Sequence, residues 1–373
     1  MFRSYMRQRQ GKQIKLVKEH GAFSCIRTVW FTSRINSKMA TSSSVPDDFL
    51  NKLAPGYREF VEDNPSRLPS LHGAPWSPAF RQPPPGGPPD LGAGSPVPVG
   101  SQRTIDLGNF SLQVMVPSDE KPEAGWPVVL FVHGGGWVFG SAAMDNGLLS
   151  RLCVGSKCVV VSVEYRLAPE HPYPAALDDS WDSLVWLHKD GVEQLGIDPS
   201  RIALMGSSVG ASLAAIVAQR ASLSSPRIPI KLQILLVPFI DASFTAEDRS
   251  RWTPSMVEYE NNFSLPVLNM LWLRDKYLPD PKDWTNPEAS PNYQENKAAF
   301  AGVPSTLIVV AELDYLRNDG ELYARKLEQF GVAVTVKVLK GLTHMGIRAD
   351  RVCETARVFR DDLIEFVQNK LCE

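Results

Sequence analysis

A serine in a glycine-flanked turn is the clearest candidate for chemistry in this chain of 373 residues. Ser208 lies in Gly206-Ser207-Ser208-Val209-Gly210, after the apolar run 202–205 and before a helix-like stretch at 211–220. Glycines on both sides of a serine let the backbone turn sharply from a strand into a helix and expose the hydroxyl. The N-terminus of the helix then lies close to any negative charge that develops beside the serine. The pattern therefore predicts a nucleophilic serine.

Backbone donors for a developing oxyanion are predicted upstream of this turn. The apolar run 128–132 indicates a buried strand, and His133-Gly134-Gly135-Gly136 follows it. Three successive glycines leave their backbone N–H groups unshielded. In enzymes that combine such a segment with this serine turn, the glycines and the residue after the nucleophile donate to the oxyanion. We therefore expect the oxyanion hole to use the N–H groups of Gly135, Gly136 and Val209.

A nucleophilic serine needs a base, and the base needs an acid that orients it. In enzymes with this serine turn, the acid and then the histidine follow the serine along the chain. Of the six histidines, only His344 comes after Ser208, and it follows a strand-like run at 334–339. His344 is therefore the predicted base.

The acid is expected after the strand-like run 305–311, where Glu312, Asp314 and Asp319 follow. We predict Asp314, because it comes directly past the end of the strand. Asp319 could equally cap the helix that begins near residue 321. Asp241 follows another apolar run, 235–238, and stays an alternative.

Four segments of the chain occur in the order of a known enzyme family. They are His133-Gly134-Gly135-Gly136-Trp137, the stretch from Tyr165 to Ala176, the Ser208 turn, and Glu312-Leu313-Asp314-Tyr315-Leu316-Arg317. Over residues 100–371 the chain resembles the hormone-sensitive-lipase-like branch of the α/β-hydrolases. That branch includes arylacetamide deacetylase and many microbial carboxylesterases. The resemblance implies an α/β-hydrolase fold with a helical cap.

Three positions depart from the pattern of this family. Ser207 replaces the usual aspartate before the nucleophile, and Val209 replaces a smaller alanine after it. Met345-Gly346 replaces the Gly-Phe pair that often follows the base. None of these positions belongs to the predicted triad. We therefore expect the departures to affect the width of the pocket and the preferred substrate, and not the mechanism.

Composition divides the chain into three parts. Residues 1–38 hold nine Lys or Arg and one acid, and they predict a disordered basic extension. This extension is either a mitochondrial transit peptide or an upstream addition to a chain that naturally starts at Met39. Residues 39–100 predict an N-terminal cap helix, broken at Pro55-Gly56, and then a loop rich in proline and glycine. Residues 101–373 are expected to form the catalytic domain.

Strand-like and helix-like segments alternate within residues 101–373, which predicts an α/β fold with a mostly parallel sheet and helices on both faces. The expected strands are 112–116, 128–132, 159–163, 202–205, 232–237, 305–311 and 334–339. Helices are expected at 175–188 and 352–371, and the strand-free segment 240–300 is expected to form a helical cap insertion over the site.

Composition also limits the class of function. A formal charge of −2 and an apolar content of 43% are ordinary for a globular enzyme, and no basic excess indicates a nucleic-acid partner. There is no apolar run of about 18 residues, so no integral membrane segment is expected. The five cysteines are odd in number and lack metal-ligand spacing, which predicts reduced thiols, no metal and no organic cofactor. These features favour a cytoplasmic location, with a mitochondrial one as the alternative, and they are compatible with a homodimer.

Together these observations predict a serine carboxylester hydrolase that acts on small to medium uncharged esters through an acyl-enzyme. Two alternatives keep the same site: hydrolysis of amides such as formamides or arylacetamides, and ester hydrolysis within secondary-metabolite synthesis. A third alternative is a receptor on an inactive hydrolase fold, which the plant gibberellin receptors resemble. Those receptors lack the catalytic histidine, so His344 argues against this reading.

Overall fold

The structure is a computed structural model that describes residues 45–64, 71–82 and 89–372. All of them belong to one compact unit, residues 42–373. The predictions for residues 1–38 and for the start at Met39 lie outside the described residues.

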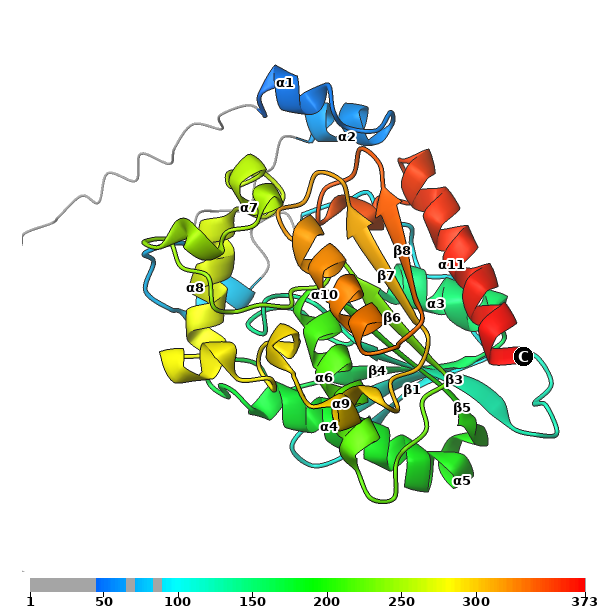
Figure 1. The fold of residues 1–373 in the computed structure, drawn as a ribbon. Helices are drawn as coiled ribbons and strands as arrows, with labels where there is room; N and C mark the ends of the chain where they lie inside the picture. Colours follow the sequence, from blue (N-terminus) through cyan, green and yellow to red (C-terminus); the bar gives the residue numbers. More distant parts are fainter. Residues whose placement is uncertain (1–44, 65–70, 83–88, 373) are drawn as a thin grey trace, which may run out of the picture. The chain divides into compact units, whose positions relative to one another are not determined.

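Eight strands form a single sheet in the order β1-β2-β4-β3-β5-β6-β7-β8 (Figure 1). β2 pairs antiparallel with both β1 and β4, and all other neighbours are parallel. This arrangement confirms the predicted mostly parallel sheet. The strands are β1 (Ser101–Asp106), β2 (Ser111–Val116), β3 (Trp126–Val132), β4 (Val159–Glu164), β5 (Ile197–Ser207), β6 (Leu232–Leu236), β7 (Thr306–Ala311) and β8 (Val334–Leu339).

The burial of the strands follows from their place in the sheet. Every residue of β3, β6 and β7 is buried, because these central strands have helices on both faces. At the two edges, β8 is only partly buried, and β1 is almost entirely exposed. The sequence analysis missed β1 for this reason: an exposed edge strand of mostly polar residues carries no apolar pattern.

Helices cover both faces of the sheet. In Figure 1, α4, α6 and α10 lie together on one face, and α3 and α11 lie together on the other. The longer helices are α3 (Asn146–Gly155), α4 (Ala175–Trp186), α6 (Val209–Leu223), α8 (Val267–Tyr277), α10 (Arg317–Gln329) and α11 (Glu354–Cys372). The shorter ones are α1 (Asp47–Leu50), α2 (Tyr57–Asp63), α5 (Val192–Leu195), α7 (Pro254–Glu258) and α9 (Lys297–Phe300).

The helix break predicted at Pro55-Gly56 is present, whereas the helix predicted over 175–188 ends early. The N-terminal helix is divided into α1 and α2, and Gly56 between them has a positive φ of 78°. The helix expected over 175–188 ends as α4 at Trp186 and continues as a π-helical turn over Leu187–Gly191. The segment 240–300 contains helices α7, α8 and α9 and no strand.

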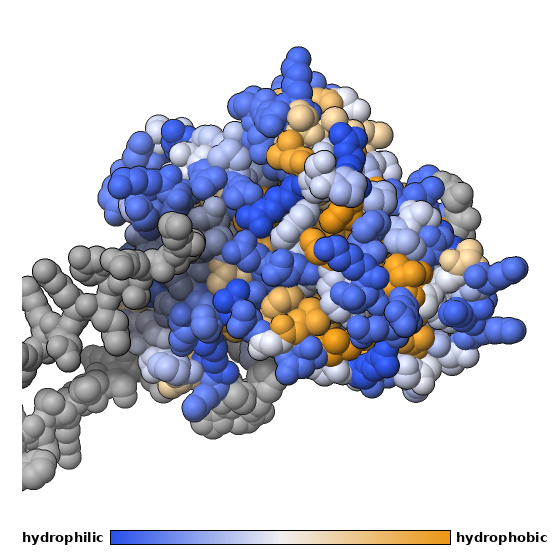
Figure 2. All heavy atoms as spheres, turned by 90° about the horizontal axis from the view of Figure 1, so that it is seen from below, coloured by the Kyte–Doolittle hydropathy of each residue, from blue (hydrophilic) through white to orange (hydrophobic). Residues whose placement is uncertain are grey.

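One face of the molecule is mostly hydrophilic. On the face shown in Figure 2, most of the coloured residues are hydrophilic, and hydrophobic residues form small separate patches. Within the part of the chain that the structure describes, no helix is both long and apolar enough to span a bilayer.

Candidate active site

The backbone at Ser208 makes the sharp turn that its sequence predicts. β5 ends at Ser207 and α6 begins at Val209, so Ser208 alone joins the strand to the helix. Its φ of 57° lies in a region that residues other than glycine rarely adopt. The Ser208 N–H donates to the carbonyl oxygen of Leu236 at 2.8 Å, which fixes the turn against β6.

The flanking glycines are required because other backbone segments approach them closely. A Cβ on Gly210 would lie 2.1 Å from the carbonyl oxygen of Val132 at the end of β3. A Cβ on Gly206 would lie 2.2 Å from the carbonyl oxygen of Gly210. Backbone cannot yield at such distances without moving a strand. The two glycines of the Gly-x-Ser-x-Gly pattern are therefore present because a side chain at either position would clash with the backbone.

Ser208, His344 and Asp314 form a continuous chain of hydrogen bonds. His344 Nε2 lies 3.0 Å from Ser208 Oγ, and His344 Nδ1 lies 2.7 Å from Asp314 Oδ2. The three residues are 7%, 5% and 1% exposed, respectively. An ionised carboxylate only accepts, so Nδ1 carries the proton and Nε2 is free to accept one from the serine. This geometry suits a serine nucleophile with a histidine base.

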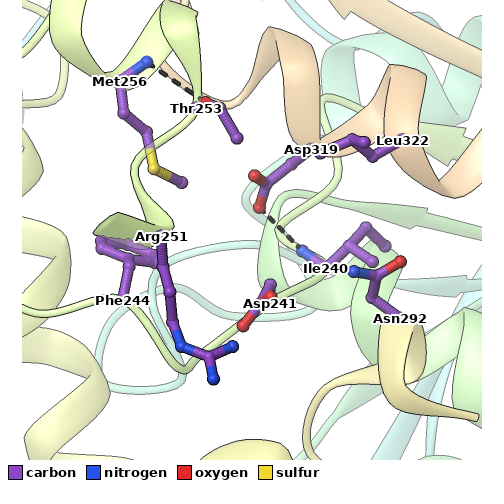
Figure 3. A pocket seen from close by; sticks show the side chains of 9 residues that line it. All are labelled: Ile240, Asp241, Phe244, Arg251, Thr253, Met256, Asn292, Asp319 and Leu322. Atoms are coloured by element: carbon purple, nitrogen blue, oxygen red, sulfur yellow. Dashed lines mark hydrogen bonds between the residues drawn. The ribbon is translucent and has the colours of Figure 1, made fainter. Parts of the chain in front are cut away.

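The two other acids that the sequence left open do not contact His344. Asp319 accepts from the Ile240 N–H at 3.2 Å, and Asp241 accepts from the Ser243 N–H at 2.7 Å. Figure 3 shows both carboxylates in a separate pocket, which Arg251 also lines. Burial, with a contribution from the charge of Asp241, raises the pKa of Asp319 well above its usual range. Asp314 is thus the acid that the fold places beside the histidine.

The glycine loop after β3 presents unused backbone donors. Gly135, Gly136 and Trp137 all have positive φ angles, of 113°, 64° and 60°. Within the described residues, the N–H groups of Gly135 and Gly136 donate no hydrogen bond. The N–H of Val209 is equally free of a helical partner, because it belongs to the first residue of α6. All three predicted oxyanion donors are therefore available.

His133 has a structural place in the same loop. It is completely buried, and its Nδ1 donates to the carbonyl oxygen of Gly134 at 2.7 Å. Its ring stacks on Tyr165, with centroids 4.1 Å apart, and the Tyr165 hydroxyl donates to the carbonyl oxygen of His133. Burial lowers the pKa of His133 to about 4, so the ring stays neutral.

Sequence reasoning missed several residues that hold the loops of His344 and Asp314. The Tyr57 hydroxyl lies 2.8 Å from Thr343 Oγ1, next to the histidine. The Met345 N–H donates to Ser264 Oγ at 3.0 Å. Asn262 Nδ2 donates to the carbonyl oxygen of Leu313, next to the acid, at 2.5 Å. No signal in the sequence marks these partners, because the fold brings them together from distant segments.

The departures from the family pattern have different surroundings. Val209 is completely buried at the start of α6, whereas Met345 is half-buried beside the histidine. Ser207 lines a cavity of about 80 Å³ together with Arg348 and Asp145, which form an ion pair at 2.9 Å. Their effect on substrate preference stays a prediction.

Among the described residues, no three side chains of His, Cys, Asp or Glu are grouped so that they could hold a metal ion. Cys153, Cys158 and Cys353 are buried and form no disulfide bond.

Comparison with known proteins agrees with this arrangement. Residues 129–347 match the model of a family described as having the alpha/beta hydrolase fold. An AB hydrolase superfamily protein of Schizosaccharomyces pombe is 39% identical over 251 residues, which cover 67% of this chain and 72% of the relative. The ethyl acetate hydrolase of Pseudomonas putida is 33% identical over 271 residues, which cover 73% of this chain and 82% of the relative.

Solved structures show the same similarity. The carboxylesterase EstE1, cloned from a metagenomic library, superposes with a TM-score of 0.67 at 33% identity, covering 74% of this chain and 90% of that one. A thermostable esterase from Pseudomonas putida superposes with a TM-score of 0.66 at 32% identity, covering 76% and 85%. With the sheet order and the serine turn described above, these matches show that the chain belongs to the α/β-hydrolase family and is a carboxylic ester hydrolase of the hormone-sensitive-lipase type.

Proposed function

We propose that the chain hydrolyses carboxylic esters through an acyl-enzyme on Ser208. The observation that carries this proposal is the hydrogen-bond chain from Ser208 Oγ through the His344 ring to Asp314, at 3.0 and 2.7 Å. Ser208 Oγ attacks the ester carbonyl while His344 Nε2 takes its proton. Asp314 keeps the imidazole in the required tautomer and stabilises the imidazolium that forms.

The remaining steps use the same groups. The N–H groups of Gly135, Gly136 and Val209 bind the negative oxygen of the tetrahedral intermediate, each contributing about 3 kcal/mol to the transition state. The intermediate collapses, and His344 returns the proton to the leaving alcohol. Water then attacks the acyl-enzyme with His344 as its base, which releases the acid and restores Ser208.

We propose small to medium uncharged esters as substrates. Supporting this, Ser208 and His344 are almost completely buried, so a substrate must fit into an enclosed space. Leu273 of α8 packs over the oxyanion loop, since a Cβ on Gly136 would lie 2.5 Å from its Cδ1. This contact supports the proposal that the segment 240–300 forms a cap over the site. One relative is named as an ethyl acetate hydrolase, and ethyl acetate is a small uncharged ester.

Labelling with an organophosphonate tests the proposed nucleophile. The intact protein should hydrolyse p-nitrophenyl acetate, and mass spectrometry should place one phosphonate on Ser208. Ser208→Ala should remove both activity and label. Ser207→Ala is the matched control, because it changes the neighbouring hydroxyl and should keep both. A label on Ser207, or an active Ser208→Ala variant, would refute the assignment.

We also propose a cytoplasmic location. The odd number of cysteines supports it, as do Cys153 and Cys353, which are buried and form no disulfide bond. Fractionation of cells that express the tagged full chain tests this, and recovery with mitochondria would refute it.

A further inference from the structure

Two described N-terminal segments, 45–64 and 71–82, contact the loops that the proposed mechanism uses. We infer that Tyr57 and Arg81 are positioning residues for catalysis. Tyr57 holds the loop of His344, and Arg81 holds the oxyanion loop, residues 134–139. This inference rests on the function proposed above, and it adds residues outside the matched family region, 129–347, to the machinery of the site.

The contact of Tyr57 is adjacent to the catalytic histidine. Tyr57 is the first residue of α2 and is 4% exposed, and its hydroxyl lies 2.8 Å from Thr343 Oγ1. Thr343 Oγ1 also accepts from the Gly346 N–H at 3.2 Å, so one oxygen links both sides of His344. Burial raises the pKa of Tyr57 to about 12, which keeps its hydroxyl protonated.

A second contact strengthens the link between the N-terminal segment and this loop. The Ala54 N–H donates to the carbonyl oxygen of Gly341 at 2.9 Å. The next residue, Leu342, accepts from the Leu313 N–H of the acid loop at 2.9 Å. The N-terminal segment therefore holds the histidine loop at two points, while the acid loop holds it at a third. Removing one point should loosen His344 relative to Asp314 without unfolding the sheet.

Arg81 makes the corresponding contact with the oxyanion loop. Its Nε donates to the carbonyl oxygen of Val138 at 2.8 Å, and its Nη2 donates to that of Ala168 at 2.6 Å. The guanidinium also pairs with Glu170 at 2.7 Å and lies 4.8 Å from the ring centroid of Trp76. Because these contacts fix the position of the guanidinium, the carbonyl group of Val138 is bound to a donor that does not move freely.

The oxyanion loop needs such support. Within it, Trp137 has a positive φ of 60°, a conformation that residues other than glycine keep only when their surroundings determine it. Val138 directly follows these residues, and its carbonyl is the one that Arg81 binds. A small displacement there moves the Gly135 and Gly136 N–H groups, and displacements of about 1 Å can cost up to a hundredfold in rate.

Tyr57→Phe tests the first contact, because it removes the hydroxyl and keeps the ring. We expect kcat for p-nitrophenyl acetate to fall about three- to tenfold with KM within about twofold, as the loss of one hydrogen bond implies. Phosphonylation of Ser208 should slow by the same factor, because it uses the same base. Thr343→Val removes the same contact from the other side together with the Gly346 contact, so its loss should be at least as large.

Tyr323→Phe is the matched control. It also removes a buried tyrosine hydroxyl, which accepts a hydrogen bond from Gln219 Nε2 at 3.0 Å between α10 and α6. It should lower the melting temperature and leave kcat unchanged. If Tyr57→Phe and Thr343→Val both fold and keep the wild-type kcat, the inference for Tyr57 is overturned.

Arg81→Met tests the second contact, with Arg227→Met as its control. Arg227 also donates to two backbone carbonyls, of Ser222 and Ala301, away from the site. We expect Arg81→Met to lower kcat/KM about ten- to hundredfold, as the loss of charge-assisted bonds implies. Arg81→Lys should restore part of the loss, because it returns one charged donor.

An aryl trifluoromethyl ketone separates positioning from general stability. Its adduct with Ser208 carries a negative oxygen in the oxyanion hole, so its affinity should weaken in Arg81→Met by the same factor as kcat/KM. Unchanged affinity in a folded Arg81→Met variant would overturn the inference. If wild type is neither active nor labelled at Ser208, the proposed function fails. If wild type is both active and labelled, and the Tyr57 and Arg81 variants have the same kcat and kcat/KM as their control variants, only the positioning role fails.

Discussion

Replacing Asp314 by asparagine should reduce activity far more than the loss of one hydrogen bond suggests. Asp314 Oδ2 accepts from His344 Nδ1 at 2.7 Å, and Oδ1 accepts from the Leu316 N–H at 3.1 Å. An asparagine at this position has one oxygen and one NH₂ group. The Leu316 N–H requires the oxygen on its own side, so the NH₂ group faces Nδ1. A donor facing Nδ1 moves the imidazole proton to Nε2.

The consequence for the rate follows from this tautomer. With its proton on Nε2, His344 cannot accept the proton of Ser208 Oγ, which lies 3.0 Å away. Loss of the correct tautomer lowers kcat by about 10³- to 10⁴-fold, equivalent to about 4 to 5.5 kcal/mol of transition-state stabilisation. The fold should survive, because asparagine has nearly the same shape as aspartate.

Initial rates with p-nitrophenyl acetate, together with melting temperatures, measure this effect. Asp319→Asn and Asp241→Asn are controls with the same chemical change, and both side chains lie in the separate pocket of Figure 3. Each should keep kcat within about tenfold of wild type, since neither contacts His344. An Asp314→Asn variant that is as active as these controls would refute the reasoning, and a severe loss at Asp241 would transfer the role of the acid.

Three further predictions concern substrate size, pH and packing. For p-nitrophenyl esters, kcat/KM should rise with acyl length, peak at about four to six carbons and fall beyond about eight. The reason is that an enclosed pocket gains about 0.8 kcal/mol of binding free energy per methylene only until it is full. Preferential hydrolysis of long-chain triglyceride emulsions would contradict this. The pKa of Asp319 is higher in the folded state than in the unfolded chain. This difference makes the folded state less stable as the pH rises above the pKa of the unfolded chain. Asp319→Asn should therefore raise the melting temperature at neutral pH more than at pH 4, and an equal change at both would contradict the raised pKa. Gly210→Ala should yield little folded protein by circular dichroism, because its Cβ would lie 2.1 Å from the carbonyl oxygen of Val132.

The central strands and the grouping of Ser208, Asp314 and His344 could be predicted from the sequence because most of their signals are local. β8 has the predicted bounds of 334–339, and β3 and β7 differ from the predicted runs by at most two residues. Their continuous apolar character follows from burial on both faces of the sheet. The serine turn and the three glycines are equally local, since close backbone contacts and positive φ angles require those residue types. The order of serine, acid and histidine then limited the choice of partners.

The parts that could not be predicted depend on distant contacts. β1 is an exposed edge strand, and it forms because β2 offers it an unpaired edge. Tyr57 and Thr343 are 286 residues apart in the chain, and only the fold places their hydroxyls at 2.8 Å. The choice among Asp241, Asp314 and Asp319 was open for the same reason. All three follow apolar strands, and the difference between them is which neighbour each carboxylate meets.

The two buried histidines show how surroundings separate a base from a structural side chain. Both His133 and His344 follow a strand and enter a loop beside Ser208, and both are at least nine-tenths buried. His133 Nδ1 donates to a carbonyl oxygen and its ring stacks on Tyr165, while burial, with a contribution from the charge of Arg348, lowers its pKa to about 4. Taking a proton there would leave a positive charge without a counter-charge. His344 faces the carboxylate of Asp314 at 2.7 Å, so an imidazolium is paired at the moment it forms. The carboxylate of Asp314 therefore supports the role that we propose for His344, whereas the surroundings of His133 suit a neutral structural side chain.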